Sequence, residues 1–261
     1  MLYFESFGSG SSGNLYYIKT EEGAFFIDAG VGIRKLKKYL REYGISLGQI
    51  DGILVTHNHV DHVRSLGLLN QKDHLTVYMT RGVRDGIMEN PVITRKPLTE
   101  TSVIIEKQEP FTLAGAEITA FEVPHDSKDN VGYLIRHNNV AFCIVTDCGQ
   151  WTREIEDHVS RATHLVVESN YDRLMLSQGP YPARLQHRIS NGYGHFENTL
   201  AADVIRRHQH HLRHVWLCHL SENNNTPRLA LQSARAALNE NSLLPIDVLD
   251  RTLPSRLFQL C

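Results

Sequence analysis

The sequence predicts an α/β protein in which layered β-sheets carry helices on their outer faces. Short apolar runs dominate the first half of the chain, and in the second half such runs alternate with stretches of helical periodicity. Strands and helices in this order favour stacked sheets with helices outside them. No linker, low-complexity segment or short-period repeat interrupts the 261 residues, so we expect one domain, residues 1–261.

Composition narrows the class of protein. The chain is 41% hydrophobic and 21% charged, which is ordinary for a soluble globular protein. Its net charge of −2 gives no strong global attraction for nucleic acid, although bound cations could create a local one. No apolar run approaches the roughly 18 residues of a membrane helix, and none of the four cysteines lies in a CxxC pair. We therefore expect reduced thiols, a cytoplasmic location and no membrane association.

The predicted elements begin with a hairpin, Leu15–Ile18 and Ala24–Ile27, after a Gly- and Ser-rich loop at 8–14. This loop is either flexible or brings its backbone N–H groups to an anionic ligand. Helices are expected after Gly32 and near His62. Further strands are predicted at Ile53–Thr56, Val103–Ile105, Ile118–Val123, Val131–Ile135, Val140–Val145, Leu165–Val167 and Val215–Cys218. Further helices are predicted at Trp151–Val159, Ala183–Ile189, Thr199–Arg207 and Arg228–Leu238.

A cluster of potential metal ligands follows one of these apolar strands: His57, His59, Asp61 and His62. In extended backbone, His57 and His59 project to the same side, while Asp61 and His62 fall where the chain turns into a helix. Two sets of ligands can thus diverge from one loop, which predicts two neighbouring metal ions. The alternative is an exposed polar loop, but the apolar strand Ile53–Val55 points this loop out of a core.

This His-x-His-x-Asp-His motif resembles the signature of the metallo-β-lactamase-fold hydrolases, and the likeness extends to Asp28, His125, Asp147 and His219. It implies a single-domain, four-layer αββα sandwich. It also implies that Asp28 orients the metal loop from beneath, a role compatible with a simple helix cap. The implied ligands of one ion are His57, His59 and His125, those of the other are Asp61, His62 and His219, and Asp147 bridges the two.

The implied chemistry is metal-dependent hydrolysis. Imidazole and carboxylate ligands suit zinc and tolerate manganese or iron, and no further cofactor is expected. Two ions about 3.5–4 Å apart hold a hydroxide between them and neutralise charge on the displaced oxygen. Besides its place as a ligand, Asp61 is positioned to accept the proton of the bridging water. Cys148 and Cys218 adjoin ligand positions, but we interpret both as packing residues.

Segments outside the metal motifs resemble the small bacterial YycJ/WalJ-type family, which is regarded as DNA exonucleases. These segments are residues 8–14, 124–126, 168–172, 179–182, 194–195 and 217–227. The resemblance implies a phosphodiesterase that works from a DNA strand end in the 5′ to 3′ direction. The interval from position 147 to position 219 leaves no room for the inserted domain of larger nucleases. Cys148 and Phe196 stand where aliphatic residues are more usual.

Two further residues are candidates for catalysis. His195 lies in a glycine-flanked turn before a predicted helix, where it could protonate a leaving oxygen or hold a phosphate, with Glu168 behind it. Backbone N–H groups at the start of that helix would add to an anion site. The alternative role for His195 is a helix cap. Arg184, His187 and Arg188 could follow a phosphate backbone or form a solvated helix face.

Two other classes of function remain open. The first is a small-molecule hydrolase acting on a cyclic phosphodiester, thioester or lactone, which the compact size and small net charge would suit. The second is a metal-binding module without catalysis, against which the complete set of seven ligand positions argues. The expected partner of the chain is a DNA strand end, and the sequence points to no protein partner.

Overall fold

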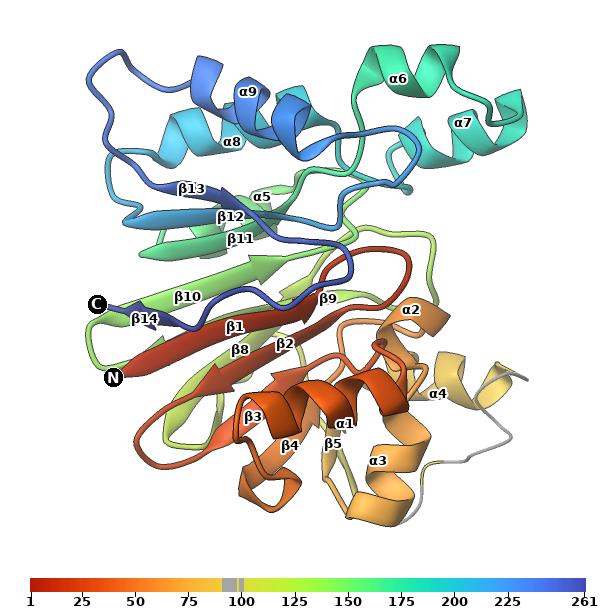
Figure 1. Cartoon of the computed structure of the whole chain (residues 1–261), viewed down its shortest axis with the longest axis vertical. Helices are drawn as coiled ribbons and strands as arrows, with labels where there is room; N and C mark the ends of the chain where they lie inside the picture. The colour runs from red at the N-terminus through yellow and green to blue at the C-terminus, as the bar shows by residue number, and fades with distance from the viewer. Residues whose placement is uncertain (91–97, 99–100) are drawn as a thin grey trace.

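Two β-sheets face each other at the centre of the molecule, and helices cover the outer face of each (Figure 1). The computed structural model describes residues 1–90, 98 and 101–261. The arrangement is the four-layer αββα sandwich that the sequence predicts. In Figure 1, α1 and α3 lie below the paired sheets and α8 and α9 lie above them.

Each sheet has seven strands over the described residues. The first sheet runs in the order β14 (Phe258–Leu260), β1 (Leu2–Gly8), β2 (Leu15–Lys19), β3 (Ala24–Ile27), β4 (Ile50–Leu54), β5 (Val77–Met79) and β6 (Ser102–Ile104). The second runs in the order β13 (Ile246–Val248), β12 (His214–Cys218), β11 (His164–Glu168), β10 (Val140–Val145), β9 (Val131–His137), β8 (Ala116–Glu122) and β7 (Phe111–Leu113).

The helices divide between the two outer layers by their position in the chain. Those of the first half are α1 (Ile33–Glu42), α2 (Val60–Val63), α3 (Leu66–Asp73) and α4 (Arg81–Glu89), with a 3-10 turn, η1, at Leu47–Gln49. Those of the second half are α5 (Arg153–Val159), α6 (Arg173–Gln178), α7 (Ala183–Ser190), α8 (Asn198–His208) and α9 (Pro227–Ala236). None of the described helices is long and apolar enough to cross a membrane.

Three apolar clusters hold the four layers together. The central one lies between the sheets, where Phe4 of β1 packs against Phe142 of β10 and Trp216 of β12 at ring-centroid distances of 5.0 and 4.9 Å. The other two lie between each sheet and its helices. Full burial of one such large side chain contributes roughly 1.5–3 kcal/mol, so the aromatic contacts across the sheets fix how the two halves meet.

Strand β1 is a feature that the sequence patterns do not predict. It pairs with β2 and with the C-terminal strand β14, so the two ends of the chain lie side by side. Its side chains are buried on both faces, which removes the polar and apolar alternation that marks a half-exposed strand. The short strands β5, β7, β13 and β14 and the helices α4 and α6 are also absent from the prediction.

The topology brings several strand ends to one edge of the sandwich. Strands β3 and β4 are parallel, as are β10, β11 and β12, so their carboxyl ends point the same way within each sheet. Loops that follow such ends are where α/β proteins place their ligands. Most of the predicted metal ligands, and Glu168 as well, lie on these loops or strand ends.

Glu5 in β1 is a buried carboxyl group outside this edge. It is 1% exposed and its Oε1 has no hydrogen-bond partner among the described residues. Burial raises the pKa of Glu5 from 4.5 to about 7. The folded chain therefore holds this proton at pH values where the unfolded chain has released it, and the associated stability is lost as pH rises from about 4.5 to about 7.

We predict that Glu5→Gln will be more stable than the wild type at pH 8 by about 1–3 kcal/mol, since one pKa unit corresponds to about 1.4 kcal/mol. At pH 5 the difference should nearly vanish. Urea unfolding of both proteins at the two pH values measures it, and groups that titrate equally in both cancel in the comparison. An equal difference at both pH values would contradict the assignment.

Candidate metal centre

The loop after β4 that carries His57, His59 and Asp61 is held from beneath by Asp28, which directly follows β3. The carboxylate of Asp28 accepts hydrogen bonds from the backbone N–H of Thr56 at 2.9 Å and from Nδ1 of His62 at 2.7 Å. Gly30 lets the two loops touch, because a Cβ at this position would lie 1.5 Å from the carbonyl oxygen of Asp61. The structure thus places Asp28 where the sequence predicts, below the motif and fully buried.

Three of the predicted ligands gather on one side of the site: His57, His59 and His125. Nδ1 of His125 donates to the carbonyl oxygen of Gly194 at 2.7 Å, which leaves its Nε2 facing Nδ1 of His59 at 3.3 Å. Nε2 of His57 is buried without a hydrogen-bond partner among the described residues. A buried ring nitrogen with no partner is costly, so this atom fits a metal ligand.

The other three gather beside them: Asp61, His62 and His219. An oxygen of Asp61 lies 3.6 Å from Nε2 of His62 and 3.4 Å from Nε2 of His219. Burial lowers the pKa of His219, but the charge of Asp147 and hydrogen bonds to two further carboxylates outweigh it and raise the pKa to about 10. Negative charge gathered this closely can hold divalent cations as well as protons.

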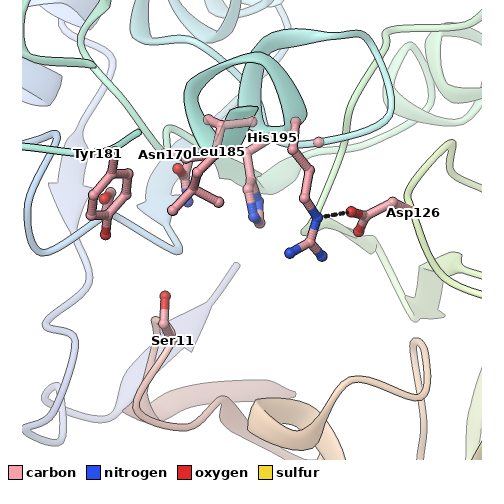
Figure 2. A pocket seen from close by; sticks show the side chains of 10 residues that line it. Ser11, Asp126, Asn170, Tyr181, Leu185 and His195 are labelled. Carbon is pink, nitrogen blue, oxygen red and sulfur yellow. Dashed lines mark hydrogen bonds and ion pairs between the residues drawn. The ribbon is translucent and has the colours of Figure 1, made fainter. Parts of the chain in front are cut away.

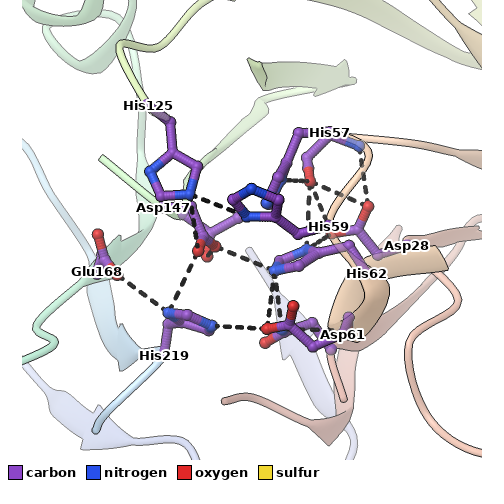
Figure 3. Close-up of polar contacts among 12 residues, drawn as sticks. Asp28, His57, His59, Asp61, His62, His125, Asp147, Glu168 and His219 are labelled. Atoms are coloured by element: carbon purple, nitrogen blue, oxygen red, sulfur yellow. Dashed lines mark hydrogen bonds and ion pairs between the residues drawn. The ribbon is translucent and has the colours of Figure 1, made fainter. Parts of the chain in front are cut away.

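Asp147 lies between the two sets (Figure 3). Its Oδ2 is 3.2 Å from Nε2 of His62, and its Oδ1 is 3.7 Å from Nε2 of His125. Burial raises the pKa of Asp147, but the charges of His219 and His62 outweigh burial and hold it well below its usual value. An ionised carboxylate that lies near residues of both sets stands where a bridging ligand would lie.

Three residues of the site have backbone in the left-handed region: Asp28, Asp147 and His219, with φ values of 63°, 52° and 53°. Each stands at or just after the end of a strand, where the chain must turn toward the gap between the sheets. Residues other than glycine adopt this conformation at a cost of about 1–3 kcal/mol. The surrounding hydrogen bonds therefore hold these three residues in place.

His195 lies beside the two sets, against the carboxylate of Glu168. Nδ1 of His195 donates to Oε1 of Glu168 at 2.7 Å, and the same oxygen accepts Nδ1 of His219 at 3.0 Å. The His195 ring lies 5.2 Å from that of His125 and 5.3 Å from that of His219, measured between centroids. Burial lowers the pKa of His195, but the charge of Glu168 outweighs it and raises the pKa.

The prediction that His195 stands at a helix start, either as a cap or offering N–H groups to an anion, is wrong. Helix α8 begins at Asn198 and its N-cap is Glu197. The backbone N–H of His195 donates to the carbonyl oxygen of Ile189 at 2.8 Å, and that of Phe196 donates to Glu168 at 3.1 Å. What His195 offers the site is therefore its imidazole ring alone.

The structure also adds residues that the sequence patterns do not single out. Asn14, in the Gly- and Ser-rich loop, lies 2.9 Å from Nε2 of His62, and Asn170 donates to the carbonyl oxygen of His219 at 2.7 Å. An amide that follows a strand or a glycine-rich loop is too common to signal a site. Cys148 and Cys218 are fully buried among apolar residues, in accord with a packing role.

These residues fit two divalent ions. The imidazole rings of His62, His125 and His219 each have Nδ1 against an oxygen acceptor, which fixes the ring and turns Nε2 inward. Such outer partners are typical of histidines that bind metals. Together with the unpartnered Nε2 of His57 and the oxygens of Asp61 and Asp147, they form a donor set of imidazoles and carboxylates, which zinc and similar ions prefer.

The αββα fold and this donor set define a metal-dependent hydrolase. A family model described as a beta-lactamase superfamily domain matches residues 24–220, and the chain belongs to this superfamily. It is 33% identical to the exodeoxyribonuclease YycJ of Bacillus anthracis over 243 residues, which cover 92% of this chain and 90% of that protein.

Two more similarities extend the comparison. The chain is 31% identical to the exodeoxyribonuclease WalJ of Streptococcus pneumoniae over 223 residues, 85% of this chain and 82% of that protein. The crystal structure of Zn²⁺-bound PqqB from Methylobacterium extorquens superposes with a TM-score of 0.74 at 17% identity, covering 97% of this chain and 99% of that one. This last likeness shows the shared fold.

We predict that the protein binds two metal ions per chain, because the candidate ligands gather in two neighbouring sets with Asp147 between them. Elemental analysis of protein purified without chelator and then reconstituted with excess zinc should approach two ions. His57→Ala should lose one ion and keep the other, since His57 belongs to one set. Wild-type protein that holds at most one ion after reconstitution would contradict the prediction.

Proposed function

We propose that the protein is a dinuclear-metal phosphodiesterase that removes nucleotides from DNA ends, in the 5′ to 3′ direction. The observation that carries the proposal is His195, which stands beside the metal ligands with Nδ1 held by Glu168, in a chain similar over most of its length to two exodeoxyribonucleases. A histidine in this position can donate a proton to the oxygen that leaves when a phosphodiester is hydrolysed. The direction rests on the family resemblance.

The proposed ligands of one ion are His57, His59 and His125, those of the other are Asp61, His62 and His219, and Asp147 is shared. When bound, two divalent ions, zinc above all, with manganese or iron as alternatives, supply a hydroxide nucleophile and neutralise charge on the displaced oxygen. The protein contributes the fixed geometry of the donors and the residues that move protons around them.

Asp61 is the proposed acceptor of the proton from the attacking water. Its pKa is lowered to about 2, because the charges of His62 and His219 outweigh the effect of burial, so the carboxylate is ionised at neutral pH. The side chain is also 21% exposed, which gives it access to solvent for passing the proton on. Asp147, by contrast, is enclosed and serves as a ligand.

His195 is the proposed donor of a proton to the leaving oxygen. Glu168 holds Nδ1, so Nε2 is the nitrogen that faces the substrate. Because Glu168 is fully buried and accepts four hydrogen bonds, the ring has one orientation and one tautomer. A positioned acid of this kind is worth about 10²–10⁴-fold in rate.

A digestion panel tests the function. Single- and double-stranded DNA and RNA, each labelled at the 5′ or the 3′ end, are incubated with the zinc- or manganese-loaded protein. We expect mononucleotides released from the 5′ end of DNA. Turnover of cyclic phosphodiesters, thioesters or lactones with no turnover of DNA would instead support a small-molecule hydrolase.

Asp61→Ala is the control that ties any DNA hydrolysis to this site. It removes a charged group at the site edge and no apolar core contact, so the fold should persist while turnover falls below about a tenth of the wild-type rate. Circular dichroism checks the fold of the variant. Retention of most of the activity would place the reaction outside this centre.

We predict that His195→Ala will lower kcat about 10²–10⁴-fold on oligonucleotides, with metal content unchanged because His195 belongs to neither ligand set. A substrate whose leaving group needs no proton, such as a p-nitrophenyl phosphodiester, should be affected much less. An equal loss on both substrates would show that His195 supports the site in another way.

A further inference from the structure

A cavity of about 150 Å³ opens directly beside His195. In Figure 2 His195 projects into it between Tyr181 at one end and Asp126 at the other, and Ser11 faces them from the opposite wall. A single water needs roughly 10–15 Å³ on this measure, so the cavity takes a group the size of about ten waters. At about 30 Å³ of liquid volume per water, that is about the size of one nucleotide and far too small for a duplex.

The end of the cavity near the candidate metal ligands carries an ion pair between Arg188 and Asp126. Nε of Arg188 is paired with Oδ2 of Asp126, whose Oδ1 lies 3.4 Å from Nε2 of His125. Asp126 thereby fixes the guanidinium next to the metal ligands. Neither terminal nitrogen of Arg188 has a hydrogen-bond partner among the residues that the structure describes, so both can bind the two oxygens of one phosphate.

The other end is aromatic and apolar. Tyr181 and Leu185 line it and pack on a small cluster formed by Tyr171, Leu176 and Ile189, the local core of α6 and α7. The hydroxyl oxygen of Tyr181 accepts a hydrogen bond from Nδ2 of Asn223 at 2.9 Å, which fixes the ring. A fixed aromatic ring offers a stacking surface for any base, because every base has a π face.

We propose that this cavity holds the terminal nucleotide of a single DNA strand, with its base against Tyr181 and a phosphate on Arg188. This inference rests on the proposed function and specifies the unit that the site recognises. It follows that a duplex end must fray before it enters, and that hydrolysis proceeds with little dependence on sequence, because stacking does not distinguish bases by hydrogen bonds.

The first test compares two single-stranded oligonucleotides, one ordinary and one that lacks the base of the terminal residue at the end where hydrolysis begins. With wild-type protein, the abasic end should raise KM roughly 5- to 150-fold, the usual contribution of one stacked base. Tyr181→Ala should raise KM for the ordinary end by a similar factor and leave KM for the abasic end unchanged. Tyr181→Phe keeps the aromatic ring, so its KM for the ordinary end should stay close to the wild-type value.

Tyr193→Ala is the matched control, because Tyr193 is 59% exposed on a nearby loop and does not line the cavity. It should leave KM for both ends unchanged. Equal effects of Tyr181→Ala on the ordinary and abasic ends, or no effect on either, would overturn the assignment of Tyr181. The wild-type comparison of the two ends needs no variant, so it stands even if Tyr181→Ala folds poorly.

The second test compares two arginines of α7. Arg188→Ala should raise KM for the ordinary oligonucleotide at least tenfold more than Arg184→Ala, which removes the same charge from a residue that does not line the cavity. Equal effects would mean that general attraction to the helix, not a phosphate held at Arg188, accounts for binding.

The outcomes separate this inference from the function on which it rests. Wild-type protein that hydrolyses no oligonucleotide under any metal condition overturns both. Metal-dependent hydrolysis of DNA that is indifferent to the abasic end, to Tyr181→Ala and to Arg188→Ala overturns the cavity assignment alone.

Discussion

The site depends on one buried carboxylate, Glu168 at the end of β11. It is fully buried and accepts four hydrogen bonds, from the backbone N–H groups of Cys148 and Phe196 and from Nδ1 of His195 and His219. Burial raises its pKa, but the charge and hydrogen bond of His195 outweigh burial, and the pKa is lowered. A buried anion is tolerable only when its oxygens are satisfied in this way.

These four hydrogen bonds to Glu168 connect all parts of the site that come from the second half of the chain. They join the loop after β10, the end of β11, the turn before α8 and the end of β12, so the elements that carry Asp147, His195 and His219 cannot move independently. They also set which nitrogen of each ring is free. Nε2 of His219 faces Asp61, and Nε2 of His195 is left for the cavity. Asp28 does the same for His62 in the first half.

The sequence predicts which residues gather at this site because of where the candidate ligands fall in the chain. Four lie within six positions after an apolar strand, and the others follow strands whose apolar runs are easy to recognise. Parallel strands then bring these loops together. The four-layer fold could be predicted for the same reason, with the family resemblance supplying the order of layers.

Other features could not be predicted because they depend on contacts between residues that are distant in the sequence. The turn at His195 lies just before a predicted helix, but its N–H groups donate to Ile189 and Glu168 instead of to a ligand. Gly194 is needed because a Cβ would lie 2.2 Å from the carbonyl oxygens of Arg188 and Ile189. The ion pair between Arg188 and Asp126 joins residues far apart in the chain, so no local sequence pattern predicts it.

Anomalous diffraction at the zinc edge, from crystals of zinc-reconstituted protein, tests the central claim most directly. If Glu168 acts as the anion that orients the histidines, two peaks should appear, both bonded to Asp147. One should lie among His57, His59 and His125, and the other among Asp61, His62 and His219. The same structure also offers a competing set of donors, Asp147, Glu168, His195 and His219. A single peak there, with Glu168 as a ligand, would contradict the account.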